Sequence, residues 1–229
     1  MSLESCAIQP PPEPAFTAAP ASRYNYQELA DIYNQTRVDY IVPMPMNAKR
    51  MEQYVTSYAI QLDASVIAID NTSELAGIGM LGLRDERAWL TRLGVLPYRR
   101  GHHLGQFLME SLLEQAVAHS AKQAQLEVIQ GNKPAHQLFL KLGFQETRDL
   151  LVVRRPPGRP AMHDPAPGTV VTLLKPAEIP LYLAQRAPGA SWIDETESLL
   201  KAGSLKGLRV ELPSGAAGWV IYQHTAFQM

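Results

Sequence analysis

The stretch GVLPYRRGHHLGQFLME, residues 94–110, decides how this sequence is interpreted. Its apolar start is typical of the end of a strand, and Leu104, Leu108 and Leu112 predict a helix that reaches about His119. Between the strand and the helix lies a loop of arginine, glycine and histidine. The first N–H groups of a helix have no partner within it, and the helix dipole adds partial positive charge there. The junction therefore suits an anion such as a pyrophosphate.

The loop itself has two interpretations. Gly101 and Gly105 let the backbone come close to a ligand because they have no Cβ. Four side chains add cationic or donor capacity: Arg99, Arg100, His102 and His103. In an ordinary strand-to-helix turn, however, glycines are present because they adopt the backbone dihedral angles that the turn requires, and arginines are present because they favour solubility. The loop alone leaves both interpretations open.

Three antiparallel strands are predicted before the loop, in the segments SVIAID, LAGIGMLGLRD and AWLTRLGVLP, residues 65–70, 75–85 and 88–97. They argue against a nucleotide-binding fold that needs a parallel βαβ unit. Helical spacing predicts two earlier helices, over residues 26–36 and 47–58.

After the loop we expect a short buried strand, QLEVIQ, at residues 125–130 and a helix over residues 134–141. Pro134 and Gly143 support this helix, because proline is favoured at the first position of a helix and glycine just beyond its end. The segment FQETRDLLVVRR, residues 144–155, indicates a further strand region.

The segment NKPAHQLFLKLGF, residues 132–144, makes the interpretation specific. Together with the loop it resembles the GNAT family of acyl-CoA-dependent N-acetyltransferases, over residues 24–155. The family's pyrophosphate loop has Gln or Arg, two residues, Gly, one residue, and Gly or Ala, and residues 100–105 occupy it here. The later motif is met by Asn132, Ala135, Leu138, Phe139, Gly143 and Phe144. The resemblance implies an α/β (α+β) fold with a mixed, mostly antiparallel central sheet flanked by helices.

The resemblance also implies a site for acetyl-CoA. Backbone groups that pair with the pantetheine arm are assigned to Leu93, Gly94 and Val95. The pyrophosphate is assigned to Arg100, Gly101, His102, His103, Leu104, Gly105 and Gln106. Asn132 is expected to contact the pantetheine region and Phe139 to lie near the thioester sulfur. Both have simpler alternatives, since Asn132 also suits a helix cap and Phe139 a core position.

Two residues depart from the family pattern. His103 replaces the first glycine of the pair, where its side chain either crowds a phosphate or donates a hydrogen bond to it. Phe139 stands where many members have a tyrosine that reprotonates the departing thiolate. Phenylalanine has no proton to give.

The implied activity is transfer of an acetyl group to a primary amine of a small molecule or peptide by direct attack. The catalytic residues are not identified by the sequence. Thr91 is a poor base, and Glu127, Asp85, Glu86 or a chain of waters remain open. The alternative is a non-catalytic acetyl-CoA-binding sensor or regulatory module, which the two departures and the missing base motivate.

The acceptor is expected to contact the loop between the first two helices. This loop holds Tyr40, Met44 and Met46, which suit an apolar or aromatic acceptor better than a polycation. The two methionines also have a simpler role as fillers of gaps in the packing.

Composition limits the partners. With 21 Lys+Arg against 22 Asp+Glu the net charge is −1, so nucleic acid and anionic membrane surfaces are not expected partners. The single cysteine, Cys6, excludes an internal disulfide and zinc sites with several cysteines, and we expect no metal. We expect the segment around Cys6 to be too mobile to hold a nucleophile rigidly. No run approaches the ~18 apolar residues of a membrane span, so a cytoplasmic location is expected.

Four segments are expected along the chain: a Pro/Ala-rich, extended or disordered arm over residues 1–23, the GNAT domain over residues 24–155, a Pro-rich linker over residues 156–168, and residues 169–229. The last has the order strand, helix, helix, hairpin and resembles the opening part of a second GNAT-like unit. Alternatively, the strands of this segment complete the sheet of the GNAT domain, either in the same chain or in the partner of a homodimer. Each version predicts one cofactor site per chain.

Overall fold

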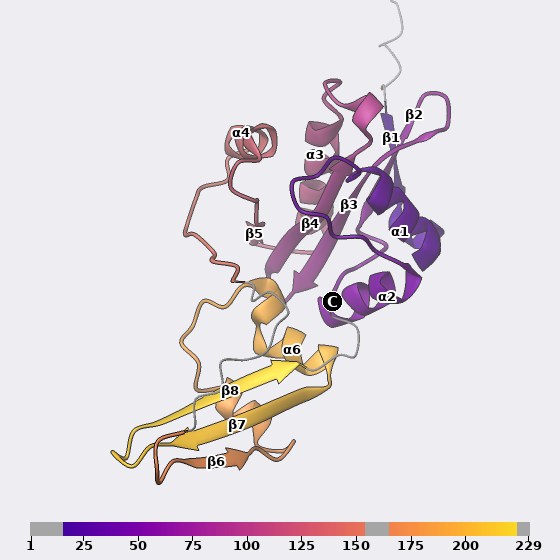
Figure 1. The fold of residues 1–229 in the computed structure, drawn as a ribbon. Coiled ribbons are helices and arrows are strands. Elements are labelled where there is room, and N and C mark those ends of the chain that lie inside the picture. Colours follow the sequence, from indigo (N-terminus) through magenta and orange to yellow (C-terminus); the bar gives the residue numbers. More distant parts are fainter. Residues whose placement is uncertain (1–15, 154–164, 224–229) are drawn as a thin grey trace, which may run out of the picture. The chain divides into compact units, whose positions relative to one another are not determined.

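The structure is a computed structural model that describes residues 16–153 and 165–223 (Figure 1). Cys6, the start of the predicted arm and the centre of the predicted linker lie outside the described residues. The chain divides into two compact units. One comprises residues 1–52 and 60–142, and the other comprises residues 53–59 and 143–229. Residues 143–153, which we expected to close the first domain, are thus grouped with the second unit.

The first unit is built on a five-stranded sheet with the order β1-β2-β3-β4-β5. Its strands are β1 Phe16–Pro20, β2 Val66–Asp70, β3 Leu75–Arg84, β4 Arg87–Val95 and β5 Gln123–Gln125. Its helices are η1 Ala21–Arg23, α1 Tyr26–Gln35, η2 Pro97–Arg99, α3 Leu104–Ala118 and α4 Lys133–Lys141, and α2 Ala48–Ser57 begins in it. Neighbouring strands from β1 to β4 are antiparallel, and only β4 and β5 are parallel. The predicted mixed, mostly antiparallel sheet flanked by helices is confirmed.

Helices α1 and α3 cover opposite faces of β3 and β4. A Cβ on Gly79 in β3 would meet Leu112 of α3, whereas a Cβ on Gly94 would meet Thr36 at the end of α1. Gly94 pairs with Ile78, whose side chain points to the face opposite that of Gly79 because directions alternate along a strand. The buried face of α3 is formed by Leu104, Leu108, Met109, Leu112 and Ala116, which confirms the predicted apolar stripe.

The structure corrects the expected arm. From Phe16 onward the chain is not an arm: Phe16–Pro20 forms edge strand β1, paired with β2 along its whole length, and η1 follows. Proline is tolerated at the end of an edge strand because one side of that strand needs no donor. The composition concealed this strand because its partner lies about 50 residues later in the chain.

Two later strand predictions were wrong for most of their length. Of the chain around QLEVIQ only Gln123–Gln125 pairs, and these residues are exposed or half-buried, not fully buried. Residues 145–153 contain no strand, and Leu151 and Val153 are 90% and 80% exposed. Apolar and β-branched residues favour strands only where a partner strand is available. The pattern was strand-like, but no described strand pairs with it.

The second unit holds a separate three-stranded antiparallel sheet, β6-β7-β8. Its elements are β6 Val170–Leu173, α5 Ile179–Leu183, η3 Trp192–Asp194, α6 Thr196–Ala202, β7 Leu205–Glu211 and β8 Ala217–Gln223. The described elements follow the order strand, helix, helix and hairpin, and their strands form a sheet of their own and do not extend the first one. Trp192 is fully buried and donates from Nε1 to the Tyr58 carbonyl at 2.8 Å.

None of the helices in the described ranges has the length and apolar character needed to cross a membrane.

Candidate functional site

The C-terminal end of β4 presents an open backbone edge. On one side β5 pairs with β4 only at residues 87–89, and no other described strand joins that edge. On the other side the register between β3 and β4 shifts, and Arg92 has a φ of 52°. The extra residue is a β-bulge, which takes backbone groups out of the ladder with β3. Leu93, Gly94 and Val95, the residues predicted for the pantetheine arm, follow this bulge.

Gly94 is required because the end of α1 comes close to β4. A Cβ at this position would lie 2.6 Å from the Thr36 Cβ and closer still to its hydroxyl oxygen, whereas real contacts stay above about 3.0 Å. Thr36 is the C-cap of α1 and donates its hydroxyl to the Tyr33 carbonyl at 2.7 Å. The absence of a side chain at Gly94 therefore lets the open end of β4 lie directly against the end of α1, after which the predicted acceptor loop begins.

The loop after β4 leads directly into an uncapped helix. Gly101 and His103 have φ values of 82° and 60°, and α3 begins at Leu104. The His103 side chain makes no capping hydrogen bond, and the first turn of α3 contains no acidic residue. The first N–H groups of α3 are thus left without a side-chain acceptor, as an anion site requires. The left-handed φ of His103 costs on the order of 1 kcal/mol, which a glycine avoids.

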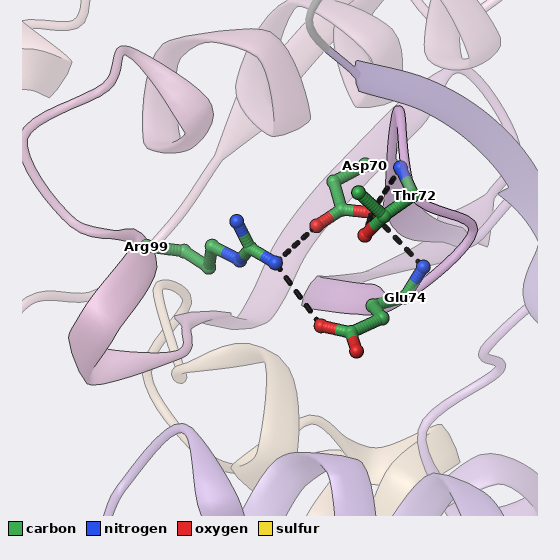
Figure 2. A network of polar contacts seen from close by, with 4 residues as sticks. All are labelled: Asp70, Thr72, Glu74 and Arg99. Atoms are coloured by element: carbon green, nitrogen blue, oxygen red, sulfur yellow. Dashed lines mark hydrogen bonds and ion pairs between the residues drawn. The ribbon is translucent and has the colours of Figure 1, made fainter.

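Arg99 is engaged in a network of polar contacts with residues at the turn between β2 and β3 (Figure 2). Its guanidinium pairs with the Asp70 carboxylate and lies 3.1 Å from the Glu74 Oε2. Asp70 also accepts from the Thr72 hydroxyl at 2.7 Å and from the Thr72 and Glu74 N–H groups at 2.8 and 2.9 Å. The Thr72 hydroxyl is the main cause that holds the pKa of Asp70 below its usual value. The network fixes η2, and with it the start of the loop, to the turn between β2 and β3.

Arg100, predicted to contact the pyrophosphate, is also paired. Its Nη1 lies 2.5 Å from the Asp39 carboxylate, and it donates to the carbonyls of Thr36 at 3.1 Å and Val95 at 3.3 Å. The hydrogen bond lowers the pKa of Asp39 and raises the pKa of Arg100, each away from its ordinary value. Arg100 therefore holds the loop against the end of α1. The motif gave no sign of this because Asp39 lies 61 residues earlier.

A lysine that sequence reasoning missed stands beside the first turn of α3. Lys141 of α4 donates from Nζ to the Gln106 Oε1 at 2.9 Å, and Gln106 donates to Glu110 at 2.7 Å. A Cβ on Gly105 would lie 3.4 Å from Leu138, so α4 approaches α3 closely at this point. The sequence places Lys141 in the last turn of a helix, where basic residues are favoured. It does not show that Gln106 of α3 lies beside this lysine in the fold.

Asn132 and Phe139 adopt the simpler roles that we had left open. Asn132 is the N-cap of α4 and accepts from the Ala135 N–H at 3.5 Å. Phe139 is the buried residue of α4, with 7% of its surface exposed. The contacts to the cofactor that the resemblance implied for these two residues remain predictions.

The predicted acceptor loop is anchored at both ends. The Asn34 side chain donates to the Met46 carbonyl at 2.8 Å and accepts from the Met46 N–H at 2.9 Å. The Tyr40 ring lies 4.1 Å from the Arg37 guanidinium. Tyr40, Met44 and Met46 are each half-buried, so the loop combines a fixed frame with accessible apolar surface.

The three candidate bases differ in their distance from the bulged end of β4. Asp85 and Glu86 lie at the tip between β3 and β4, and at ~3.3 Å per residue they stand roughly 20 Å from Leu93. They are too far to act on a group bound there. Glu127 lies two residues beyond Gln125, which is level with Trp89, and its Oε2 accepts from the Trp89 Nε1 at 2.6 Å. Of the three carboxylates Glu127 is therefore nearest to the bulge.

The bulged end of β4, the uncapped start of α3 and the mixed sheet agree with the acyl-CoA-dependent acyltransferase class that the sequence predicts. The chain belongs to the acetyltransferase (GNAT) family, whose model matches residues 26–144. The predicted family is thereby confirmed, and the predicted use of acetyl-CoA agrees with this membership.

Individual proteins are similar to parts of this chain. A Bacillus subtilis protein named as a candidate ribosomal protein bS18-alanine N-acetyltransferase is 32% identical over 82 residues, which are 36% of this chain and 54% of that protein. The chain thus spans about half the length of that relative. Among solved structures, the Escherichia coli ribosomal-protein-S18-alanine N-acetyltransferase is 18% identical, with a TM-score of 0.47, over 58% of this chain and 79% of that one. A Salmonella typhimurium protein named as a candidate acetyltransferase and solved with acetyl-CoA is also 18% identical, with a TM-score of 0.47, over 59% of this chain and 82% of that one.

Proposed function

We propose that this chain is an N-acetyltransferase that passes the acetyl group of acetyl-CoA to a primary amine of a small molecule or peptide. The observation that carries the proposal is the continuity of two backbone sites. The open edge at residues 93–95 leads within one short loop to the uncapped first turn of α3. A long ligand with amide groups at one end and a pyrophosphate in its middle matches this order.

In the proposed complex the pantetheine arm pairs with the edge of β4, and the pyrophosphate lies on the N–H groups of residues 103–106. Leu93 and Val95 already accept hydrogen bonds from Arg37 and Arg100 through their carbonyls. A carbonyl has two lone pairs, so each is still able to accept a second donor. Lys141 supplies a positive charge beside the pyrophosphate.

The reaction needs a neutral amine placed against the thioester carbonyl. The amine nitrogen forms a bond to the carbonyl carbon, the oxyanion is stabilised by N–H groups at the bulge of β4, and the carbon–sulfur bond then breaks. Glu127, through a water molecule, is our candidate for accepting the proton that the amine loses. Phe139 has no proton to donate, so the thiolate of coenzyme A takes its proton from water.

Calorimetry and thiol release test the proposal in sequence. Titration with acetyl-CoA is expected to release heat that saturates, and the chain is then expected to release coenzyme A thiol with at least one member of a panel of amino acids, peptides and aromatic amines. Absence of heat at millimolar acetyl-CoA would refute the cofactor site.

The second candidate is an acetyl-CoA-binding sensor without turnover. The specific observations in its favour are the left-handed His103 in the loop and the non-acidic Phe139. Tight binding of acetyl-CoA with no thiol release from any amine in the panel would favour it over the enzyme.

We also propose that residues 169–229 are the opening part of a second unit of the same type. In both units a strand precedes two helices and an antiparallel hairpin, and the strand orders β1-β2-β3 and β6-β7-β8 correspond. A counterpart of β4 and its loop is not among the described residues of the second unit, so one cofactor site per chain is proposed.

A further inference from the structure

Arg37 is a half-buried cation for which the described residues supply no counter-ion. It follows the C-cap of α1, and its Nη2 donates to the Leu93 carbonyl at 3.3 Å. Its Nε and Nη1 are buried and have no hydrogen-bond partner. In the described ranges no carboxylate pairs with it. Arg99 and Arg100 differ in this respect, because each is paired with an aspartate.

The surroundings of Arg37 do not replace a counter-ion. The guanidinium carbon lies 4.1 Å from the centre of the Tyr40 ring and 4.9 Å from that of Tyr33. Such stacking stabilises the cation through its faces. The N–H donors, however, lie in the plane of the guanidinium, and the Leu93 carbonyl is the one acceptor among the described residues that meets them. Buried N–H donors that are left unused are costly unless a ligand completes the site.

The position of Arg37 connects the two parts of the proposed active site. Leu93 belongs to the strand end proposed to hold the pantetheine arm, and Tyr40 belongs to the predicted acceptor loop. A group bound to Arg37 therefore lies beside the place where the acetyl group is transferred. The planar fork of an arginine matches the two oxygens of a carboxylate.

We infer that Arg37 binds a carboxylate of the acceptor, so that the acceptor is an amino acid with an apolar or aromatic side chain, not a peptide. The inference rests on the proposed function. The Tyr40 ring stacks on Arg37, and the acceptor displaces it on entry, while Met44 and Met46 offer surface to the side chain. The same charge repels polycationic acceptors.

The test compares leucine, leucinamide and the dipeptide leucyl-glycine as acceptors of the full chain, with thiol release per unprotonated amine as the readout. Leucine is expected to have a kcat/KM at least tenfold above those of the other two. In Arg37→Met this preference is expected to disappear through a rise in the KM of leucine, and Arg37→Lys is expected to keep part of it. Arg23→Met, which removes an exposed arginine of the same unit, is the matched control and should keep the full preference.

The outcomes separate this inference from the proposed function. Release of no thiol from any amine would count against the proposed enzyme, whereas turnover without a preference for leucine would overturn the carboxylate site alone. Binding of N-acetylleucine to the chain with coenzyme A tests the site without turnover, and a dissociation constant unchanged in Arg37→Lys would also overturn it. If Arg37→Met does not fold, Arg37→Lys decides the outcome. Equal losses of activity on all three acceptors in Arg37→Lys would assign Arg37 a structural role and overturn the inference.

Discussion

The substitution Gly94→Ala tests the junction between β4 and α1. The new Cβ would lie 2.6 Å from the Thr36 Cβ and 3.2 Å from its Cγ2, so the two elements must separate by about an ångström to restore ordinary contact. Overpacking of this kind costs about 1–3 kcal/mol. The midpoint of thermal unfolding, followed by circular dichroism, is expected to fall by roughly 3–10 °C. Binding of acetyl-CoA is expected to weaken too, because the Thr36 carbonyl holds Arg100 against the loop.

A second substitution makes the argument quantitative. Thr36→Gly removes the three atoms nearest to the new Cβ and is expected to cost about 1 kcal/mol alone, through its lost hydrogen bond to Tyr33. The double variant is expected to be more stable than the sum of the single effects by about 1–2 kcal/mol. Gly105→Ala is the matched control, since its Cβ makes an ordinary 3.4 Å contact within a helix. Unfolding of Gly94→Ala at the wild-type temperature, or simple additivity in the double variant, would refute the reasoning.

Three further substitutions address the loop, the network and the base. His103→Gly removes a left-handed strain of about 1–2 kcal/mol and adds about 0.5–1 kcal/mol of backbone entropy cost, so the urea midpoint is expected to rise slightly; a lower midpoint would contradict the strain. The hydrogen bonds of Asp70 lower its pKa in the folded state. Its contribution to the free energy of unfolding is therefore fully present above its pKa in the unfolded chain, about 3.9, and is lost as the pH falls through its pKa in the folded chain. The difference in urea stability between wild type and Asp70→Asn should therefore be constant above about pH 5 and shrink below it, and a difference independent of pH down to 3 would speak against the network. Glu127→Gln is expected to lower kcat on the order of 10²-fold and to remove the acidic limb of the pH–rate profile, and a kcat within twofold of wild type would exclude Glu127 as the base.

Local patterns were sufficient to predict the centre of the fold. β2, β3 and β4 were recognised because each is a short apolar run bounded by turn residues, and α3 because its apolar residues recur at helical spacing. The helix start after the glycine-containing loop was visible for the same reason. These elements carry the proposed cofactor site, so its position along the chain could be read before the fold was known.

The parts that failed depend on partners far away in the sequence. β1 was concealed by Pro20 and the prolines that precede the strand, and it forms because β2 pairs with it as an edge strand. Residues 145–153 have strand composition, but no described strand pairs with them. Arg100 fitted the loop motif, yet its charge is taken by Asp39. No local pattern marks Arg37, because only the fold places it beside Leu93 and leaves it unpaired with any carboxylate of the described residues.

The central claim is that acetyl-CoA binds along residues 93–106. Titration of the ¹⁵N-labelled chain with acetyl-CoA, followed by the shifts of its backbone amide signals, tests it most directly. The account predicts saturating shifts at residues 93–95 and in the first turn of α3, with no comparable shifts for pantetheine in that turn because pantetheine has no pyrophosphate. The claim would be contradicted if the amide signals of these residues did not shift while those of another part of the chain showed saturating shifts.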